Sequence, residues 1–278
     1  PVLKCPACRR IAANDPAGIV QLGGAYFSLH RAEIMALIQH VADREMTEHP
    51  LERIMKLSDN AEFTTSTDHS SADSVVITTP TPTDDLLIDA LEKLTRERPK
   101  LSIAVLPVKN IGRDIYPFLQ AIKHQHVLDC DVFLKIHTKK SLHLDEYKGR
   151  NWRQQLLTSL CPNHEQTSQI AAALHNSEEV WLACPEAFTA GNESWGKNKK
   201  NVKALAQRIN TKVSKNLVFA AGSMFWARNE ILHTLLNLHI DEKEYSVKHD
   251  QFDGAIPHAV ERLFGVVAIH HEKKSWLF

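Results

Sequence analysis

Apolar residues in the first two thirds of the chain follow two spacings, which predict alternating strands and helices. Short apolar runs at residues 74–80, 101–108 and 130–136 are typical of strands, and the second and third look buried on both faces. Residues 84–98 and 116–127 instead carry apolar side chains at the spacing of amphipathic helices. This alternation predicts βαβ units, and therefore an α/β fold with a mostly parallel central sheet flanked by helices.

The second half of the chain has a less regular pattern. It predicts a helix at residues 149–160, a strand at 179–185 and a polar loop at 188–201. A strand–turn–strand–helix unit at 216–232 and a final helix around Pro257, at 253–268, follow. No internal repeat is visible.

Residues 1–60 lack this alternation. We expect them to form a mainly helical N-terminal appendage or linker, and residues 61–278 to form the main domain. Cys5 and Cys8 have the spacing of half a zinc site, but no second pair completes it, so we expect free thiols.

Composition narrows the class of protein. The 278 residues are 43% hydrophobic, and 33 basic residues balance 33 acidic ones, so we expect no bulk affinity for nucleic acid. Neither a membrane span nor a signal peptide is evident. Because the chain begins at Pro1, we expect it to be a piece of a longer protein, with any targeting or membrane segment outside it.

A first polar group follows the strand at 101–108 and precedes a helix. It consists of Asn110, Gly112, Arg113 and Asp114. Glycine allows a close approach of the backbone, and an Arg–Asp pair beside a helix start suits a ribose, a base or a phosphate. The alternative is a turn with an ordinary surface salt bridge.

A second polar group follows the strand at 130–136. His137, Thr138, Lys139 and Lys140 offer cations and a hydroxyl, which suit a phosphate or diphosphate. Ligands of parallel sheets lie beyond the carboxyl ends of the strands, so both groups are expected to face one crevice. The alternative is a solvated basic loop.

Later segments offer further candidates for substrate contact. Trp152 and Arg153 are placed to frame the crevice, and Gly222, Trp226 and Arg228 offer close approach, stacking and an anion contact. Both aromatic rings have the alternative role of core residues.

The final predicted helix supplies three candidates for a general base. Asp253, His258 and Glu261 lie near its start, and His258 and Glu261 share a face. The alternative is that Glu261 and Arg262 form a structural ion pair and that His258 is a core histidine.

Five segments in this order resemble the rhamnan-synthesis F family of bacterial polysaccharide glycosyltransferases. They are "NIGRDIYPFL", "DVFLKIHTKKS", "WRQQLL", "GSMFWAR" and "HAVERLF", and the resemblance covers roughly residues 75–270. It implies a divergent GT-A glycosyltransferase with a Rossmann-like fold that binds a nucleotide sugar. Asn110, Gly112, Arg113, Asp114 and residues 137–140 would then bind the donor.

The resemblance also implies a departure from the usual metal site. Many GT-A enzymes place an Asp-x-Asp where this chain has His137-Thr138-Lys139. We therefore expect the cations to neutralise the leaving diphosphate, with no cofactor, although Mg²⁺ or Mn²⁺ remains an alternative. Asp253 lies where inverting members keep their base, so it is the first choice, with His258 and Glu261 as alternatives.

The expected function is transfer of a deoxyhexose, rhamnose in the first instance, from a nucleotide sugar to a growing surface polysaccharide. The expected partners are the donor, a lipid-linked glycan acceptor at the cytoplasmic face of the bacterial inner membrane, and further transferase domains in the full-length chain. Two other functions stay open: a degenerate, non-catalytic glycan- or partner-binding module, and a nucleotidyltransferase. The latter class usually needs a carboxylate pair or a glycine-rich phosphate loop.

Overall fold

The computed structural model describes most of the predicted main domain. The described residues are 74–80, 102–137, 155–162, 164–245 and 253–278, with Trp152 and five helical positions between residues 88 and 96. The appendage predicted for residues 1–60, including Cys5 and Cys8, lies outside them.

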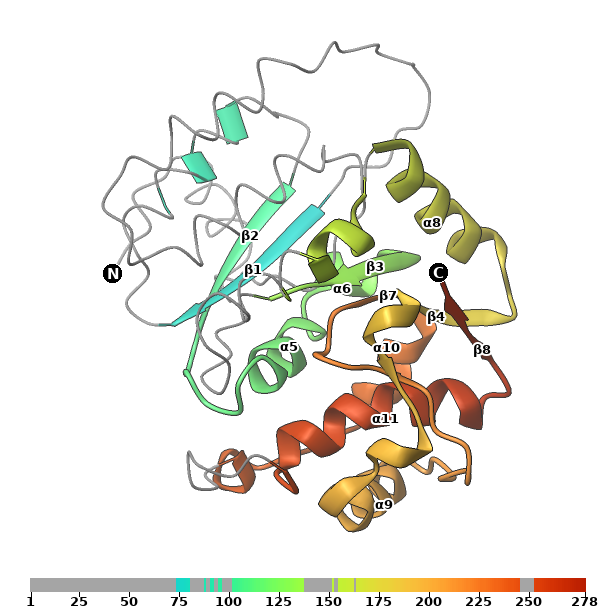
Figure 1. The fold of residues 1–278 in the computed structure, drawn as a ribbon. Coiled ribbons are helices and arrows are strands. Elements are labelled where there is room, and N and C mark those ends of the chain that lie inside the picture. The colour runs from blue at the N-terminus through green and yellow to red at the C-terminus, as the bar shows by residue number, and fades with distance from the viewer. Residues whose placement is uncertain are drawn as a thin grey trace.

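The described chain begins with a parallel pair of strands. Strand β1 (Ser74–Pro80) pairs with β2 (Ser102–Val108) in uninterrupted register along their whole length (Figure 1). The helical positions lie between them in sequence, and Leu91 among them is buried. The βαβ unit predicted from the apolar spacing is therefore confirmed.

The largest sheet is mixed rather than parallel. Its order is β3 (Val132–Lys135), β7 (Phe225–Arg228), β4 (Val180–Cys184) and β8 (Lys274–Leu277). Strand β7 runs antiparallel to both β3 and β4, whereas β4 and β8 are parallel.

The α/β class is thus confirmed, but the described sheets are small and mixed and do not form the mostly parallel sheet that we predicted. The physical reason is the connection into β7. Strand β6 (Phe219–Ala220) pairs with β5 (Thr189–Ala190), and a tight turn follows it. After this turn, β7 lies between β3 and β4 and runs antiparallel to both of them.

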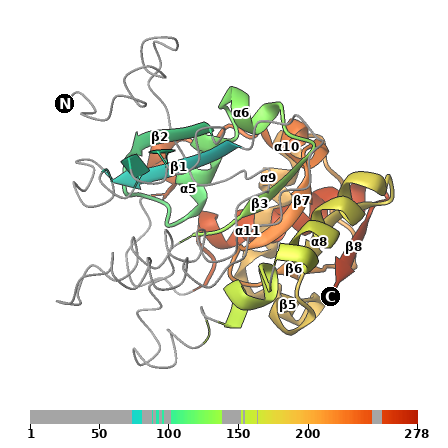
Figure 2. The ribbon, with the colours of Figure 1, turned by 90° about the horizontal axis from the view of Figure 1, so that it is seen from above.

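Helices cover the sheets. They are α5 (Ile115–Ala121), α6 (Gln125–Leu128), α8 (His164–Asn176), α9 (Lys199–Arg208), α10 (Glu230–Leu235) and α11 (Ile256–His270). Short 3₁₀ turns span Glu186–Phe188, Asn192–Ser194, Gly196–Asn198 and Glu242–Tyr245, so the predicted polar loop at 188–201 is partly helical. Helix α11 packs on α9, and both lie on one side of the sheet (Figures 1 and 2). In the described part of the chain, no helix is long and apolar enough to cross a bilayer.

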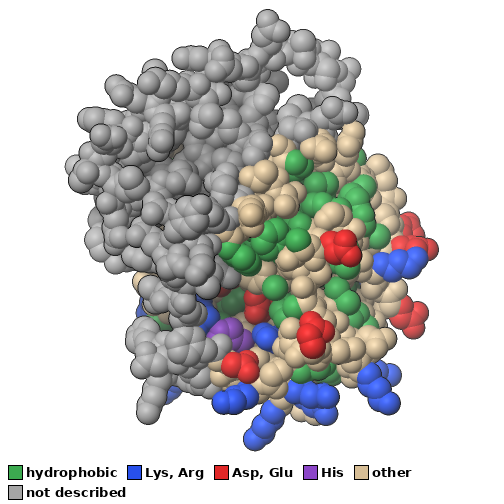
Figure 3. Space-filling model, in the orientation of Figure 1, with side chains coloured by type: hydrophobic (Ala, Val, Ile, Leu, Met, Phe, Trp, Pro, Cys, Tyr) green, Lys and Arg blue, Asp and Glu red, His purple; other side chains and the backbone are tan. Residues whose placement is uncertain are grey.

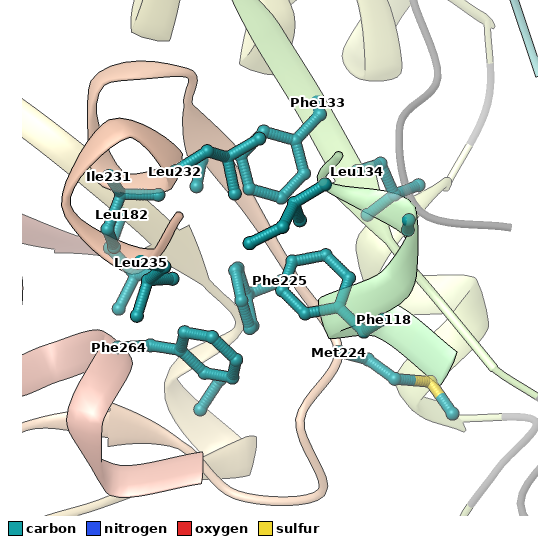
Figure 4. Packing of buried hydrophobic residues seen from close by; sticks show 14 of the residues in the cluster. Phe118, Phe133, Leu134, Leu182, Met224, Phe225, Ile231, Leu232, Leu235 and Phe264 are labelled. Carbon is teal, nitrogen blue, oxygen red and sulfur yellow. The ribbon is translucent and has the colours of Figure 1, made fainter. Parts of the chain in front are cut away.

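An aromatic cluster joins the elements that carry the polar groups (Figure 4). Phe118 of α5 lies 6.1 Å from Phe133 of β3 and 5.6 Å from Phe264 of α11, between ring centroids. Phe225 of β7 contacts both Phe133 and Phe264. Because all four rings are buried, the start of α5, the end of β3 and the first turns of α11 are held in fixed relative positions.

Candidate functional site

The turn between β6 and β7 is the point where the predicted polar groups meet. Gly222 and Ser223 have φ angles of 88° and 61°, so two successive residues are left-handed. The Gly222 amide donates to Glu261 Oε1 at 2.7 Å, and the Gly222 carbonyl accepts a hydrogen bond from His137 Nε2 at 2.8 Å. The turn therefore joins the end of β3 to helix α11, and these bonds offset the strain of its backbone.

A buried lysine forms the centre of the site. The Lys135 side chain is 1% exposed, and its ammonium donates to Asp114 Oδ2 at 2.7 Å, to the Ser223 carbonyl at 2.6 Å and to Ser223 Oγ at 3.0 Å. All three ammonium donors thus have acceptors, as a buried charge requires. Sequence reasoning missed Lys135, although a charged residue inside the apolar run 132–136 is itself a signal, because buried charges are almost always paired.

Asp114 links the two polar groups predicted at the ends of strands. Its Oδ2 lies 3.6 Å from His137 Nε2 as well as accepting from Lys135. Burial alone would raise the pKa of Asp114, but His137 and Lys135 together bring it well below its usual range. Asp114 is therefore ionised at any physiological pH, and it lies beside His137 as the sequence predicted.

Arg113 and His258 form a second contact across the site. Arg113 Nη1 lies 2.8 Å from His258 Nε2, and because a guanidinium only donates, the histidine accepts at Nε2 and carries its proton on Nδ1. His258 Nδ1 is buried without a hydrogen-bond partner among the described residues. Burial, Arg113 and Arg262 together lower the pKa of His258 to about 4, so the imidazole is neutral near pH 7.

Asp253 holds a loop in place. Its Oδ2 accepts from the Lys197 amide at 2.8 Å, and its Oδ1 accepts from the Gly254 amide at 2.9 Å and from Asn198 Nδ2. The Lys197 bond is the main reason that the pKa of Asp253 is lowered. Both oxygens of this carboxylate are thus occupied in joining the turn at 196–198 to the start of α11.

Glu261 and Arg262 complete the face of α11 toward the turn. Glu261 Oε2 lies 3.3 Å from Arg262 Nη1, and Arg262 also donates to the carbonyls of His258 and Ser194. The sequence analysis considered Arg262 only as the ion-pair partner of Glu261, and this ion pair forms. The bond from Arg262 to the Ser194 carbonyl was not predicted, because the two residues lie 68 positions apart.

Two of the predicted substrate contacts, Trp226 and Arg228, make contacts within the protein itself. Trp226 is fully buried, and its indole donates to the Leu160 carbonyl at 3.0 Å, so the core alternative describes it. Arg228 pairs across the sheet with Val132, at the other end of β3 from Lys135. There it binds Glu230 and the last carbonyls of α8.

Trp152 is half-buried and packs edge-on against Phe188, with ring centroids 5.3 Å apart.

The roles predicted for four residues stay predictions, because these residues lie outside the described part of the chain: Thr138, Lys139, Lys140 and Arg153. In the ranges that the structure describes, no group of three or more His, Cys, Asp or Glu side chains could hold a metal ion. Figure 3 shows one face on which a histidine lies between basic and acidic side chains.

Gly112 occupies a place that no larger residue fits. Its φ is 61°, and an added Cβ would lie 2.8 Å from Tyr116 Cβ and 2.9 Å from Tyr245 Cε1. Asn110, two residues earlier, is exposed. The close approach predicted for this glycine is therefore made by two tyrosines of the protein itself, whose rings meet edge-on.

Gly112→Ala is expected to lower the free energy of unfolding by about 2–4 kcal/mol, since left-handed strain and steric overlap add. Urea unfolding measures the change. Gly191→Ala is a matched control, because Gly191 has no positive φ and its nearest contact is a flexible Glu193 side chain. Equal, small losses in both variants would contradict the tight packing at Gly112.

The geometry defines a mixed α/β domain with a charged site where the end of β3 and the loop before α5 meet helix α11. The sequence profile of the family described as rhamnan synthesis protein F matches residues 26–273. The chain belongs to this family.

Two curated relatives, both called uncharacterized protein WxcX, come from Xanthomonas campestris pv. campestris, strains B100 and ATCC 33913. They are 37% and 36% identical to this chain over 164 residues. The matched region is 58% of this chain but 23% of each relative, so the chain spans only a part of their length. No solved structure matches it significantly.

Proposed function

We propose that this domain is a glycosyltransferase that moves a deoxyhexose, rhamnose in the first instance, from a nucleotide sugar to a growing bacterial surface polysaccharide. Membership of a family named for rhamnan synthesis supports a role in polysaccharide synthesis. The observation that carries the proposal is that Asp114 and His137 meet beside the turn at Gly222, while Arg113, next to Asp114 in sequence, reaches His258 of α11. The acceptor in this proposal is a lipid-linked glycan at the cytoplasmic face of the inner membrane.

The donor would be held by the loop before α5 and by the end of β3. Asp114 is ionised and its side chain remains 17% exposed, which suits a carboxylate that accepts hydrogen bonds from ribose or sugar hydroxyls. The exposed guanidinium of Arg113 suits the diphosphate. Lys139 and Lys140 lie two and three positions after His137, and in this proposal they supply further positive charge to the leaving group.

Among the three candidate bases, the contacts favour His258. Both carboxylate oxygens of Asp253 already accept hydrogen bonds, from the turn at 196–198 and from the Gly254 amide. In Glu261, one oxygen accepts from the Gly222 amide and the other pairs with Arg262. His258 is neutral, and the one hydrogen bond that its ring makes to a described residue is with the exposed Arg113. A donor diphosphate that pairs with Arg113 would release Nε2 and raise the pKa of His258 toward its usual value.

The proposed reaction is a single displacement with inversion. The acceptor oxygen forms a bond to the anomeric carbon while the bond from that carbon to the diphosphate oxygen breaks. The acceptor proton passes to His258 Nε2, and the nucleoside diphosphate leaves with the electron pair of the broken bond. Removing the proton as the bond forms keeps positive charge from building on the acceptor oxygen.

Incubation with nucleotide sugars in EDTA is expected to retain binding and transfer, because the proposed counter-charges are side chains. The measurement is a thermal-shift panel of UDP-, GDP-, dTDP- and CMP-sugars, each with EDTA or with Mn²⁺, followed by a product assay with the best donor. A rise in melting temperature that needs Mn²⁺ would contradict the cation proposal.

Donor binding without any transfer, to any glycan acceptor, would instead favour the non-catalytic binding module. One feature supports that second candidate: by the family resemblance, His137-Thr138-Lys139 would occupy the position at which many GT-A transferases carry metal-binding carboxylates. Turnover of the donor with a saccharide acceptor would exclude it.

A further inference from the structure

One continuous segment of the chain carries a single sign of charge. From Glu193 to Glu230 there is no acidic residue in between, although the whole protein has 33 acidic and 33 basic residues. The basic residues of this segment are Lys197, Lys199, Lys200, Lys203, Arg208, Lys212, Lys215 and Arg228. Solvated surfaces normally mix both signs, so this segment is unusual for the chain that contains it.

The lysines of this segment lie on its solvent side. Helix α9 buries Val202, Leu205 and Ala206 against the body of the protein and leaves its lysines exposed. Figure 3 shows Lys and Arg side chains gathered along the edge of the molecule where α9 lies in Figure 1. Six exposed lysines of this segment are together called the lysine face: Lys197, Lys199, Lys200, Lys203, Lys212 and Lys215.

Within the described part of the protein, the lysine face has no counter-charge. None of its six ammonium groups forms a salt bridge with a described residue, whereas Arg208 is paired with Glu244 and Arg228 with Glu230. Lys199 and Lys203 are one helical turn apart, a spacing at which like charges weaken a helix. An external anion would remove this repulsion.

We propose that the lysine face docks the domain on an anionic lipid bilayer. Three of the six ammonium groups lie on the exposed side of α9 and the others on the segments that flank it, so they act as separate point charges, which suit a broad negatively charged plane better than one enclosed phosphate. The exposed large apolar side chain among the described residues is Leu277, and it lies in β8 rather than in α9. Docking would therefore be electrostatic, without insertion of an apolar anchor from this face.

The lysine face is joined to the candidate site. Helix α9 packs on α11, which carries His258 and Glu261, and Asp253 holds the Lys197 amide. A domain docked through α9 would thus present its site at a fixed height above the lipid surface. The docking itself does not depend on the proposed transferase activity.

Co-sedimentation with vesicles tests the proposal. The unmodified protein is expected to bind vesicles of phosphatidylcholine with about 30% phosphatidylglycerol, and to be released as salt rises from about 50 to 300 mM. It is expected not to bind phosphatidylcholine alone. The triple variant Lys199→Gln/Lys200→Gln/Lys203→Gln should bind the anionic vesicles roughly a hundredfold more weakly.

The matched control is Lys123→Gln/Lys273→Gln/Lys274→Gln, which removes the same charge elsewhere and should weaken binding less than about threefold. Lysine and glutamine have similar helix propensity, so the α9 variant should melt as the unmodified protein does. The control lysines lie outside helices, and the loss of the exposed Lys274–Glu179 pair should change stability little. Equal weakening in both variants, or binding that ignores anionic lipid, would overturn the proposal. Binding to heparin or DNA through the same lysines, with no binding to vesicles, would replace the bilayer with a soluble polyanion.

Discussion

Asp114→Asn is expected to lower the free energy of unfolding by about 3–5 kcal/mol, because it leaves the ammonium of Lys135 buried without a counter-charge. Lys135 is 1% exposed, and its other two acceptors, both on Ser223, are neutral. For a domain of this size the melting temperature should fall by roughly 6–20 °C. Urea unfolding with a thermal melt measures both quantities.

The double variant Asp114→Asn/Lys135→Met should recover much of this loss, since an apolar side chain of similar length removes the uncompensated charge. The exposed pair of Lys274 and Glu179, each 71% exposed, provides the control. Glu179→Gln should leave the free energy of unfolding close to that of the unmodified protein, because a fully exposed ion pair contributes little. If Asp114→Asn proves as mild as Glu179→Gln, the buried pair does not hold the site together.

His258→Gln is expected to lower the rate of sugar transfer by about 10²–10⁴-fold while donor affinity changes little, if His258 takes the acceptor proton as proposed. Asp253→Asn should lower stability by about 1–2 kcal/mol, because hydrogen bonds to the charged carboxylate weaken, yet reduce the rate less than tenfold. Single-turnover kinetics and calorimetry with the donor separate these effects. A normal rate in His258→Gln together with loss of activity in Asp253→Asn would return the base role to Asp253.

The pH dependence gives an independent test of the same role. The pKa of His258 is about 4 in the free protein, so the acid limb of kcat/KM for the donor should fall near that pH. In the donor complex, the diphosphate neutralises Arg113 and raises the pKa of His258, so the acid limb of kcat should lie at higher pH. Coincident limbs would contradict the coupling between Arg113 and His258.

Some features followed from local pattern alone. The strand-turn-strand-helix unit at 216–232 and the helix around Pro257 form where the spacing predicts them, because apolar periodicity and turn residues act over a few positions. The proximity of Asp114 and His137 was also predicted from the polar residues that follow two successive strands, although these strands, β2 and β3, belong to different described sheets.

Other features depended on contacts between distant parts of the chain. The direction of β7 is set by its insertion between β3 and β4, which no local spacing records. Trp226 and Arg228 follow the turn at Gly222 closely in sequence, which suggested a role in the site. The pairing of β7 with β3 instead places Trp226 in the core and Arg228 at the end of β3 that is far from Lys135.

The sequence by itself determined which elements form and which of them end in polar residues. Only the tertiary structure decided that Lys135 is the buried counter-charge of Asp114, that Asp253 holds a loop and that His258 meets Arg113. The reason is separation: Lys135 lies 88 residues from Ser223, and Arg113 lies 145 from His258. Periodicity assigns residues to elements, but the meeting of distant side chains depends on how the packed core brings those elements together.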